Sequence, residues 1–497
     1  MKLNPLHAID FYKANHIKFY GPETTMLYNN FTPRSTKYLT KVDGTDDKIV
    51  LFGLQYFIKY FLVDTWKSEF FDQPKEKVIK KYKRRMDNAL GKDAVSTGHI
   101  SQLHDLGYLP ITVKALPEGS VVDAKIPYFT LRSNNDSMAW LAGYLEDALS
   151  CLIWKTSTSA TIARKYKKIG LDAAKKTGVD SSFVNFQFHD FQLRGCGGFQ
   201  DAVMSGGGHL LSFYGTDNVP AIDFLEDYYN ADSDKEMVGC SVYANEHSCV
   251  CSGKKENEFN NYLKWITETF PTGILSMVSD TWSLWNVITE YLPRLKDIIL
   301  SRDGKIVIRP DSSPKTPLEI ICGDPDAEIG SPEHKGVVQL LWDIFGGSVN
   351  SMGYKELDPH IGVLYGESIT MKLAQDIFKN LSDKGFASNC VLMGIGSYTY
   401  VYNTRDTLGY ACKATASIVD GEFREIFKDP VTDSGGMKKS ARGYLRVDNI
   451  NGVFVLKDQC SWEEEMGGEL ETVYHNGKII REWDLSEIRE RVSKSYN

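Results

Sequence analysis

The sequence predicts an α/β protein built on an irregular (β/α) barrel with an additional layer. Three observations support this fold class. The chain has 497 residues, more than one single-core domain usually holds. Its residues are 42% hydrophobic and 25% charged, the composition of an ordinary globular protein. From about residue 180 onward, short apolar runs repeatedly end in polar clusters and are followed by stretches long enough for helices, which is typical of parallel sheets.

The first 150 residues or so mix short strands with helices. Residues 49–58 indicate a strand or loop that enters a helix. Residues 109–115 alternate like a strand, and the Pro-Glu-Gly-Ser turn at 117–120 follows it. Residues 139–154 carry the apolar stripe of a helix that packs against the next layer.

Seven basic side chains lie between Lys75 and Arg85, with Val78, Ile79 and Tyr82 at helical spacing. Such a run can bind phosphate or nucleic acid, or it can be the solvated face of an amphipathic helix. We prefer the amphipathic helix, because the apolar residues form a stripe that a core would bury.

Seven apolar runs supply the strands of the predicted barrel. They cover residues 186–191, 211–217, 240–247, 274–280, 306–311, 361–367 and 391–397. Because the carboxyl ends of barrel strands share one rim, we expect the polar and aromatic residues there to line one site. These rim residues are Asp190, Phe191, Arg194, Asp217, His247, Asp280, Arg309, Asp311 and Glu367.

The charge balance excludes some classes of protein. With 57 Lys and Arg against 65 Asp and Glu, the net charge of −8 argues against a nucleic-acid coat or a polybasic membrane binder. We find no signal peptide and no apolar run as long as a membrane span. The nine widely spaced cysteines indicate reduced thiols. We therefore expect a cytoplasmic protein that binds neither nucleic acid nor membrane.

The rim residues suit an anionic substrate that carries a metal. Arg194 and Arg309 can each bind phosphate oxygens through two N–H groups, and carboxylates can hold Mg²⁺. The backbone amides of Gly394 and Gly396 can approach a phosphate, with Arg405 downstream. The same glycines would also fit a simple turn between a strand and a helix.

Two rim residues have both a chemical and a structural interpretation. Asp280 could accept a proton from one ring nitrogen of His247 and leave the other nucleophilic, or His247 could be an ordinary structural histidine. Asp217 could recognise a ligand or cap the helix that follows it.

Ten short motifs, in order along the chain, resemble those of the nicotinamide phosphoribosyltransferases, a family of type II phosphoribosyltransferases. The total length also fits, and the set is specific although each motif alone is weak. The motifs lie at residues 10–16, 52–56, 117–119, 189–195, 215–217, 246–248, 278–280, 308–312, 404–406 and 427–430.

The resemblance implies a homodimer with two active sites at its interface. Each subunit would have an α/β layer domain at residues 1–180, completed by about 400–497, and a barrel-like domain at 181–400. The enzyme would condense nicotinamide with 5-phosphoribosyl 1-pyrophosphate to nicotinamide mononucleotide in NAD salvage. Mg²⁺ would be bound mainly through substrate phosphates, and ATP would be a co-substrate.

The resemblance also implies roles for individual residues. Phe191 and Tyr12, the latter from the other subunit, would sandwich the pyridine ring, and Asp217 would accept a hydrogen bond from the carboxamide. Arg194 would also contact nicotinamide, and the catalytic residues would be His247, Asp280 and Asp311. His247 would be phosphorylated by ATP and oriented by Asp280. The ribose and phosphate groups would contact Arg194, Arg309, Asp311, Gly366, Glu367, Gly394, Gly396, Arg34, Arg405, Lys413 and Lys428.

The chain departs from the family pattern at a few positions. Glu367 stands where the family usually has Asp, and Ala411 occupies a position that is often Ser, so one phosphate-binding hydroxyl would be missing. The glycine run is reduced to Gly-Ile-Gly-Ser-Tyr at 394–398. None of these changes removes the residues of the expected chemistry.

Other functions stay open at this point. A nicotinate-using phosphoribosyltransferase is the nearest one, although Asp217 would repel the carboxylate of nicotinic acid. A catalytically silent nucleotide-binding protein on the same scaffold is a second. A barrel glycosidase with a carboxylate pair such as Asp280 and Asp311 is a third, but it would not need the arginines.

Overall fold

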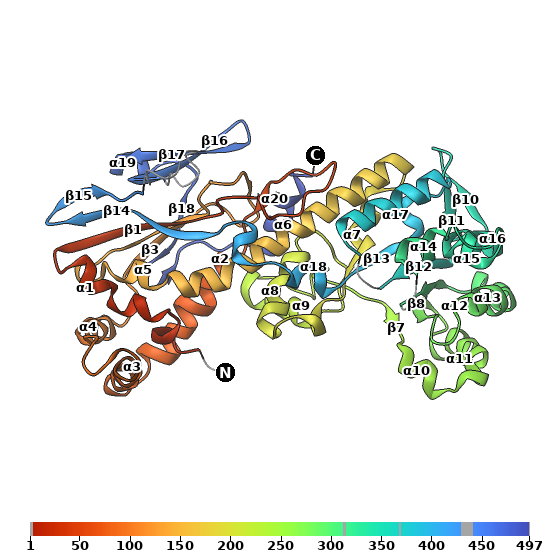
Figure 1. The fold of residues 1–497 in the computed structure, drawn as a ribbon, viewed down its shortest axis with the longest axis horizontal. Helices are drawn as coiled ribbons and strands as arrows, with labels where there is room; N and C mark the ends of the chain where they lie inside the picture. The colour runs from red at the N-terminus through yellow and green to blue at the C-terminus, as the bar shows by residue number, and fades with distance from the viewer. Residues whose placement is uncertain (1–2, 312–314, 367–368, 429–440, 497) are drawn as a thin grey trace.

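The computed structural model describes residues 3–311, 315–366, 369–428 and 441–496. The molecule is elongated, with an antiparallel sheet at one end and a curled parallel sheet at the other (Figure 1). The long helix α6 (Glu146–Thr177) runs between the two sheets.

The antiparallel sheet combines the two ends of the chain. Its long strand β1 pairs with β14 on one side and with β5 on the other. The seven strands, in spatial order, are β15 (Glu422–Glu425), β14 (Ala411–Val419), β1 (Thr24–Thr32), β5 (Phe129–Ser133), β3 (Ile111–Ala115), β18 (Glu471–His475) and β19 (Lys478–Ile479). The expected layer therefore exists, whereas the domain boundaries at 180 and 400 stay predictions.

The parallel sheet is a curled half-barrel, which confirms the coarse form of the predicted fold. Its six strands, in spatial order, are β6 (Phe188–Asp190), β13 (Leu392–Ile395), β12 (Ile361–Tyr365), β9 (Gly304–Arg309), β8 (Gly273–Val278) and β7 (Tyr243–Ala244). Each predicted run except 211–217 overlaps one of these strands. That run contributes two isolated parallel bridges, Asp190↔Thr216 and Gly215↔Cys240, because its first residues pack as a buried turn after α8 (Phe199–His209).

Helices follow most strands of the half-barrel and cover it. Glycine and asparagine end several of them in left-handed conformations. These helices are α9 (Val219–Tyr229), α10 (His247–Ser252), α11 (Glu258–Lys264), α13 (Leu292–Leu300), α14 (Pro317–Cys322), α16 (Val337–Phe345), α17 (Met371–Asp383) and α18 (Ser397–Val401). Among the described residues, no helix combines the length and apolarity that a membrane crossing needs.

The helix predicted at residues 139–154 is two helices, α5 (Leu141–Tyr144) and the longer α6. The apolar stripe stops at Trp154 because the buried face of α6 then becomes polar. There, Thr156 Oγ1 donates to the carbonyl of Phe52 (2.9 Å) and Ser157 Oγ to that of Val50 (2.5 Å). These side chains satisfy backbone groups beside the short strand β2 (Ile49–Val50), so a polar face can be buried.

The basic run forms the amphipathic helix α3 (Lys75–Leu90), as predicted. Val78, Tyr82 and Met86 are buried on one face, and most of the basic side chains are exposed. The strand predicted at 109–115 is β3, and the segment at 49–58 enters the helix α2 (Leu54–Tyr56). The sequence pattern therefore located these elements correctly.

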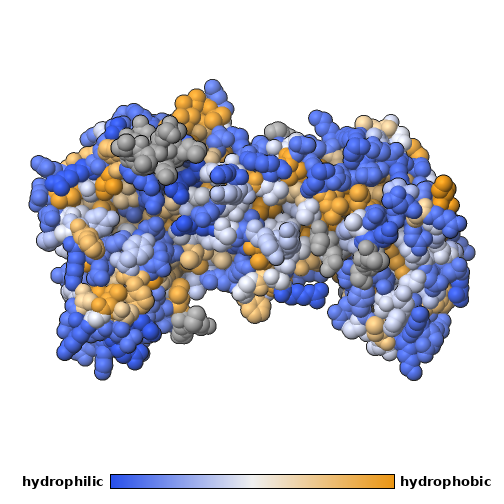
Figure 2. All heavy atoms as spheres, viewed as in Figure 1, coloured by the Kyte–Doolittle hydropathy of each residue, from blue (hydrophilic) through white to orange (hydrophobic). Residues whose placement is uncertain are grey.

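The surface seen in Figure 2 is mainly hydrophilic. Apolar atoms gather at the tip of the hairpin of β16 (Tyr444–Ile450) and β17 (Val453–Cys460), which projects from the antiparallel end (Figures 1 and 2). Ile450, Val453 and Val455 are exposed there.

Candidate active site

A cleft of about 620 Å³ opens at the carboxyl ends of the parallel strands. The structure brings most of the predicted rim residues to this one cleft. Its lining includes the expected residues Asp190, Phe191, Arg194, Asp217, His247, Arg309, Asp311, Gly366 and Gly396. It also includes Leu193, Gly195, Glu246, Ser248, Ser397, Tyr398 and Thr399.

Phe191 is fixed immediately after β6. Its backbone N–H donates to the carbonyl of Ile395 (3.0 Å), and its ring centroid lies 4.6 Å from that of His189. A Cβ on Gly394 would lie 2.5 Å from the Phe191 ring. Gly394, predicted to contact phosphate, is therefore required for aromatic packing and does not line the cleft.

Asp217 follows the bridge that joins residues 190 and 216. Its Oδ1 accepts hydrogen bonds from His189 Nε2 (2.9 Å) and Ser241 Oγ (2.5 Å). Burial acts to raise the pKa of this carboxyl, but the two hydrogen bonds and the charge of Arg309 outweigh burial and lower the pKa. Asp217 is thus an anion on the cleft wall, and its side chain is 45% exposed.

Two guanidinium groups face the same cleft. Arg194 is exposed in a short 3₁₀ turn after β6, and Arg309 ends β9. Arg309 Nη2 donates to the carbonyl of Asn245. Its Nε is buried without a hydrogen-bond partner among the described residues. A buried donor of this kind would be satisfied by an anionic oxygen in the cleft.

His247 begins α10 and contacts three polar side chains. Its Nδ1 is hydrogen-bonded to Thr281 Oγ1 (2.9 Å), while Nε2 lies 3.5 Å from Asp311 Oδ2 and 3.8 Å from Asp280 Oδ1. Asp280 is buried, and its Oδ2 accepts the backbone N–H of Asp311 (2.8 Å). The 3.8 Å between His247 and Asp280 is therefore longer than the hydrogen bond expected between them. The other ring nitrogen of His247, Nδ1, is held by Thr281.

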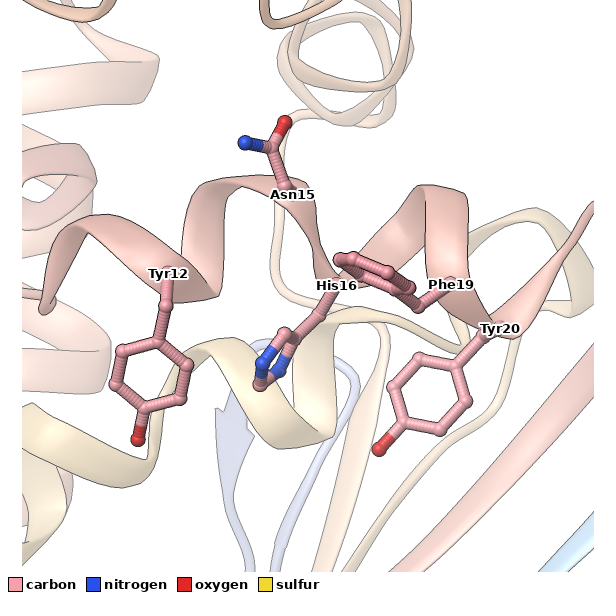
Figure 3. Close-up of a pocket in the computed structure, with 5 residues that line it drawn as sticks. All are labelled: Tyr12, Asn15, His16, Phe19 and Tyr20. Carbon is pink, nitrogen blue, oxygen red and sulfur yellow. The ribbon is translucent and has the colours of Figure 1, made fainter. Parts of the chain in front are cut away.

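Tyr12 lies outside the cleft, on the surface of the antiparallel end. With Asn15, His16, Phe19 and Tyr20 it lines a separate hollow of about 430 Å³ (Figure 3). Figure 3 shows the Tyr12, His16 and Tyr20 rings on one side of this segment, with Asn15 pointing away. Tyr12 is 55% and Phe19 is 85% exposed, so two aromatic rings face solvent here.

The remaining predicted cations also lie outside the cleft. Arg34 Nε donates to the carbonyl of Gly409 (2.9 Å), which places it beside the turn that follows Arg405. Lys413 is exposed on β14, and Lys428 is exposed after β15. We call Tyr12, His16, Phe19, Arg34, Arg405 and Lys413 the sheet patch.

Charged side chains from distant parts of the sequence act on the Cys151 thiol. Burial raises the pKa of the Cys151 thiol, the carboxylates of Asp147 and Asp10 raise it further, and Arg405 lowers it. Asp10, in the segment that carries Tyr12, and Arg405 are thus both near enough to Cys151 to act on its pKa.

Two noted departures have different outcomes. Glu367 lies outside the described residues. Ala411 is buried in β14, where it pairs with Thr32, and it does not line the cleft.

Sequence reasoning missed several polar residues of the site. Three of them do not line the cleft but hold predicted residues in place. His189 and Ser241 contact Asp217, and Thr281 contacts His247. Ser397 follows Gly396 at the start of α18, and a Cβ on Gly195 would lie 2.1 Å from its Oγ. The Gly-Ser dipeptide after a strand was a usable signal for Ser397, whereas the other three depend on contacts between distant segments.

Comparison with known proteins supports a single family. Residues 186–478 match the model of the nicotinate phosphoribosyltransferase family. The chain is 50% identical to a nicotinamide phosphoribosyltransferase of Acinetobacter baylyi, over 99% of this chain and 98% of the relative. It is 30% identical to a nicotinamide phosphoribosyltransferase of Xanthomonas campestris pv. campestris, over 98% of this chain and 97% of that protein.

Solved structures resemble the fold at low sequence identity. Human nicotinic acid phosphoribosyltransferase superposes with a TM-score of 0.55 at 15% identity, over 98% of this chain and 93% of that chain. A nicotinate-nucleotide pyrophosphorylase of Pyrococcus furiosus gives a TM-score of 0.53 at 15% identity, over 99% and 95% of the two chains. These two likenesses concern the fold alone.

Proposed function

The chain belongs to the nicotinate phosphoribosyltransferase family, and we propose that it condenses nicotinamide with 5-phosphoribosyl 1-pyrophosphate in NAD salvage. The products are nicotinamide mononucleotide and pyrophosphate. The observation that carries this proposal is the cleft, whose lining places the Phe191 ring and the Asp217 carboxylate beside the guanidinium groups of Arg194 and Arg309. The relative with 50% identity, named for this activity, supports the choice of base.

The base would lie against Phe191 and be read by Asp217. A carboxamide N–H can donate to the Asp217 carboxylate, whereas the carboxylate of nicotinic acid would be repelled by it. Stacking on an aromatic ring adds about 0.5 to 1.5 kcal/mol beyond burial of the base. This arrangement orients the ring nitrogen toward the phosphoribosyl group.

The chemical step needs positioning more than activation of the base. The ring nitrogen forms a bond to C1 of the ribose as the bond from C1 to the pyrophosphate oxygen breaks, and the electron pair of that bond leaves with pyrophosphate. Arg194 and Arg309 would stabilise the charge that grows on the leaving group. Holding the two reactants in line would supply a large share of the rate enhancement.

A divalent cation fits this cleft when substrate phosphates provide part of its shell. Asp311 lines the cleft with a 36% exposed side chain, so its carboxylate could bind Mg²⁺. No group of three or more His, Cys, Asp or Glu among the described residues forms a ready metal cage. Bound Mg²⁺ would neutralise phosphate charge, while the chain's own residues orient the substrates.

We also propose that ATP phosphorylates His247. Since Thr281 holds Nδ1, we infer that Nε2 accepts the phosphoryl group as its bond to ADP breaks. Nε2 is the nitrogen that faces Asp311 in the cleft. The phosphorylated ring would add negative charge able to bind Mg²⁺ and so couple ATP hydrolysis to nucleotide synthesis.

We propose that the active unit is a homodimer in which the sheet patch of one subunit completes the cleft of the other. Phe191 in the cleft would contact one face of the base, and the exposed Tyr12 of the other subunit would contact the second face. Arg34, Arg405, Lys413 and Lys428 would then surround the phosphates. We place this enzyme in the cytoplasm, in agreement with its composition.

The direct test is an assay of the purified chain with Mg²⁺ and 5-phosphoribosyl 1-pyrophosphate, in which released pyrophosphate is measured with each base. We expect nicotinamide to be used with a higher kcat/KM than nicotinic acid. A preference for nicotinic acid would reject the proposed base. Absence of transfer to either base would indicate the silent scaffold, and bond cleavage without any phosphoribosyl donor would indicate a glycosidase.

A further inference from the structure

Three neighbouring segments of the half-barrel place four side chains in one row. His189 lies in β6, and Phe191 directly follows this strand. Asp217 follows the bridge between residues 190 and 216, and Ser241 follows the bridge between residues 215 and 240. The ring of His189 lies against Phe191 on one side and contacts Asp217 on the other. The row therefore links the two groups expected to bind the base.

Both hydrogen bonds to Asp217 use the same oxygen. His189 Nε2 and Ser241 Oγ both contact Oδ1, and no described residue donates a hydrogen bond to Oδ2. An ionised carboxylate only accepts, so His189 must carry its proton on Nε2 and Ser241 must donate its hydroxyl proton. Oδ2 is thus left as the acceptor for a ligand in the cleft.

Gly215 makes room for this arrangement. A Cβ at residue 215 would lie 2.7 Å from Nδ1 of His189, a distance that real Cβ atoms avoid. His189 is also largely buried, with 8% of its surface exposed. The backbone therefore fixes the ring of His189 in the position from which it reaches Asp217.

We propose that His189 and Ser241 are specificity-determining residues that hold Oδ1 of Asp217, so that Oδ2 accepts the carboxamide N–H and rejects the carboxylate of nicotinic acid. This inference rests on the proposed function, because it concerns the same base. A neutral Asp217 would carry its proton on Oδ2 and could donate to a carboxylate. The two donors keep the carboxyl ionised and so prevent this exchange of roles.

The inference makes a prediction that a purely structural role does not. Loss of either donor would make the charged form of Asp217 less favourable and would leave the carboxylate free to turn. The KM for nicotinamide would rise while kcat changes little, and nicotinic acid would become a relatively better substrate. A structural defect would instead lower the activity with both bases together.

Ser241 offers the sharper test, because it is exposed and its substitution leaves the core intact. Steady-state kinetics with each base would be measured for the wild type, Ser241→Ala and Ser241→Thr. We expect Ser241→Ala to lower the ratio of kcat/KM for nicotinamide to that for nicotinic acid about tenfold, since a hydrogen bond to a charged group is lost. Ser241→Thr keeps the hydroxyl and should keep the ratio within about threefold.

His189 gives an independent pair of variants. His189→Gln keeps an N–H donor, and His189→Leu removes it, so only the second should lower the ratio about tenfold. In an Asp217→Asn background, Ser241→Ala should change the ratio no further, because the two residues act through one oxygen. Circular dichroism would verify that each variant is folded.

The outcomes separate this inference from the proposed function. A wild-type enzyme that prefers nicotinic acid, or uses neither base, rejects the proposed function before any variant is measured. A wild-type preference for nicotinamide with an unchanged ratio in Ser241→Ala overturns only the role of His189 and Ser241. Equal losses with both bases, or an additive effect of Ser241→Ala in the Asp217→Asn background, would also overturn it.

Discussion

The cleft and the sheet patch differ in how their side chains are held. In the cleft, Asp217, His247 and Arg309 each have a named hydrogen-bond partner. In the sheet patch, Tyr12 and Phe19 are exposed aromatic rings, and Lys413 projects from a strand into solvent. The cleft is a preorganised polar site. The sheet patch is a surface rich in aromatic rings, which are common in protein interfaces, and in cations, which bind anions.

This difference indicates a division of labour. Phe191 in the cleft is the ring predicted for one face of a planar base, and Tyr12, the ring predicted for the other face, lies in the sheet patch. A side chain that is held can select a ligand, whereas an exposed one gains its contacts only when a partner arrives. We therefore expect the cleft to determine the chemistry and the sheet patch to complete it from a second subunit.

The strongest test of this comparison removes a held cation from the cleft. We expect Arg309→Ala to reduce kcat/KM about 10³-fold, because a preorganised cation that stabilises transition-state charge is lost. Arg481→Ala removes an exposed arginine that does not line the cleft and pairs with the nearby Glu487, so it serves as the matched control. A loss of less than tenfold in Arg309→Ala would contradict a role at the leaving group.

Mixed dimers test whether the two regions meet between subunits. We expect Tyr12→Ala and Phe191→Ala each to lose about 10²-fold in activity when expressed alone. Co-expression would form half of the dimers as hybrids, each with one site that has both rings, so about a quarter of the wild-type activity should return. Activity of the co-expressed pair no higher than that of the single variants would show that the two rings do not share a site across subunits.

His247 tests the cleft itself. We expect His247→Ala to retain basal turnover but to lose the stimulation by ATP, because C1 chemistry does not need the imidazole. Pyrophosphate release with and without ATP measures this, and phosphate incorporated from labelled ATP should vanish in the variant. A full ATP response in His247→Ala would reject the phosphohistidine.

The sequence identified the cleft better than its supporting contacts. Residues such as Asp217, Arg309 and Asp311 were predicted because parallel strands end at one rim, a rule that holds whatever the detailed register. His189 and Thr281 were missed because their roles depend on which side chains face each other across segments that are distant in sequence. Hydrogen-bond partners of this kind leave no periodic signal.

Gly394 shows another limit of spacing arguments. A glycine after a strand can admit a phosphate to the backbone or admit a ring, and the sequence pattern is the same in both cases. The structure shows that Phe191 occupies the space. Similarly, the predicted helix stopped at residue 154 because the buried face of α6 is polar beyond that point. Its burial depends on hydrogen bonds to the segment around β2 rather than on apolar residues.

The prediction with the smallest expected effect concerns the free energy of unfolding. It compares the two ends of the molecule through one buried histidine in each. His209 lies in α8 at the half-barrel and His99 in α4 (Gly98–Leu106) at the antiparallel end, and burial lowers the pKa of each to about 4. An unfolded histidine titrates near 6.5, so between pH 6.5 and 4 the unfolded chain binds more protons. The stabilising contribution is therefore complete above pH 6.5 and is lost as the pH falls toward 4.

From pH 7 to pH 5, each histidine should cost about 2 kcal/mol in the free energy of unfolding. Glu118 acts in the opposite direction, since burial raises its pKa to about 7, so the wild-type curve alone does not isolate either histidine. Urea denaturation of the wild type, His209→Gln and His99→Gln at both pH values does isolate them. The stability gap between the wild type and each variant should shrink by about 2 kcal/mol at pH 5. A gap that stays constant for one variant only would show that this histidine is not held neutral, and that the two regions differ in how tightly they exclude a charge.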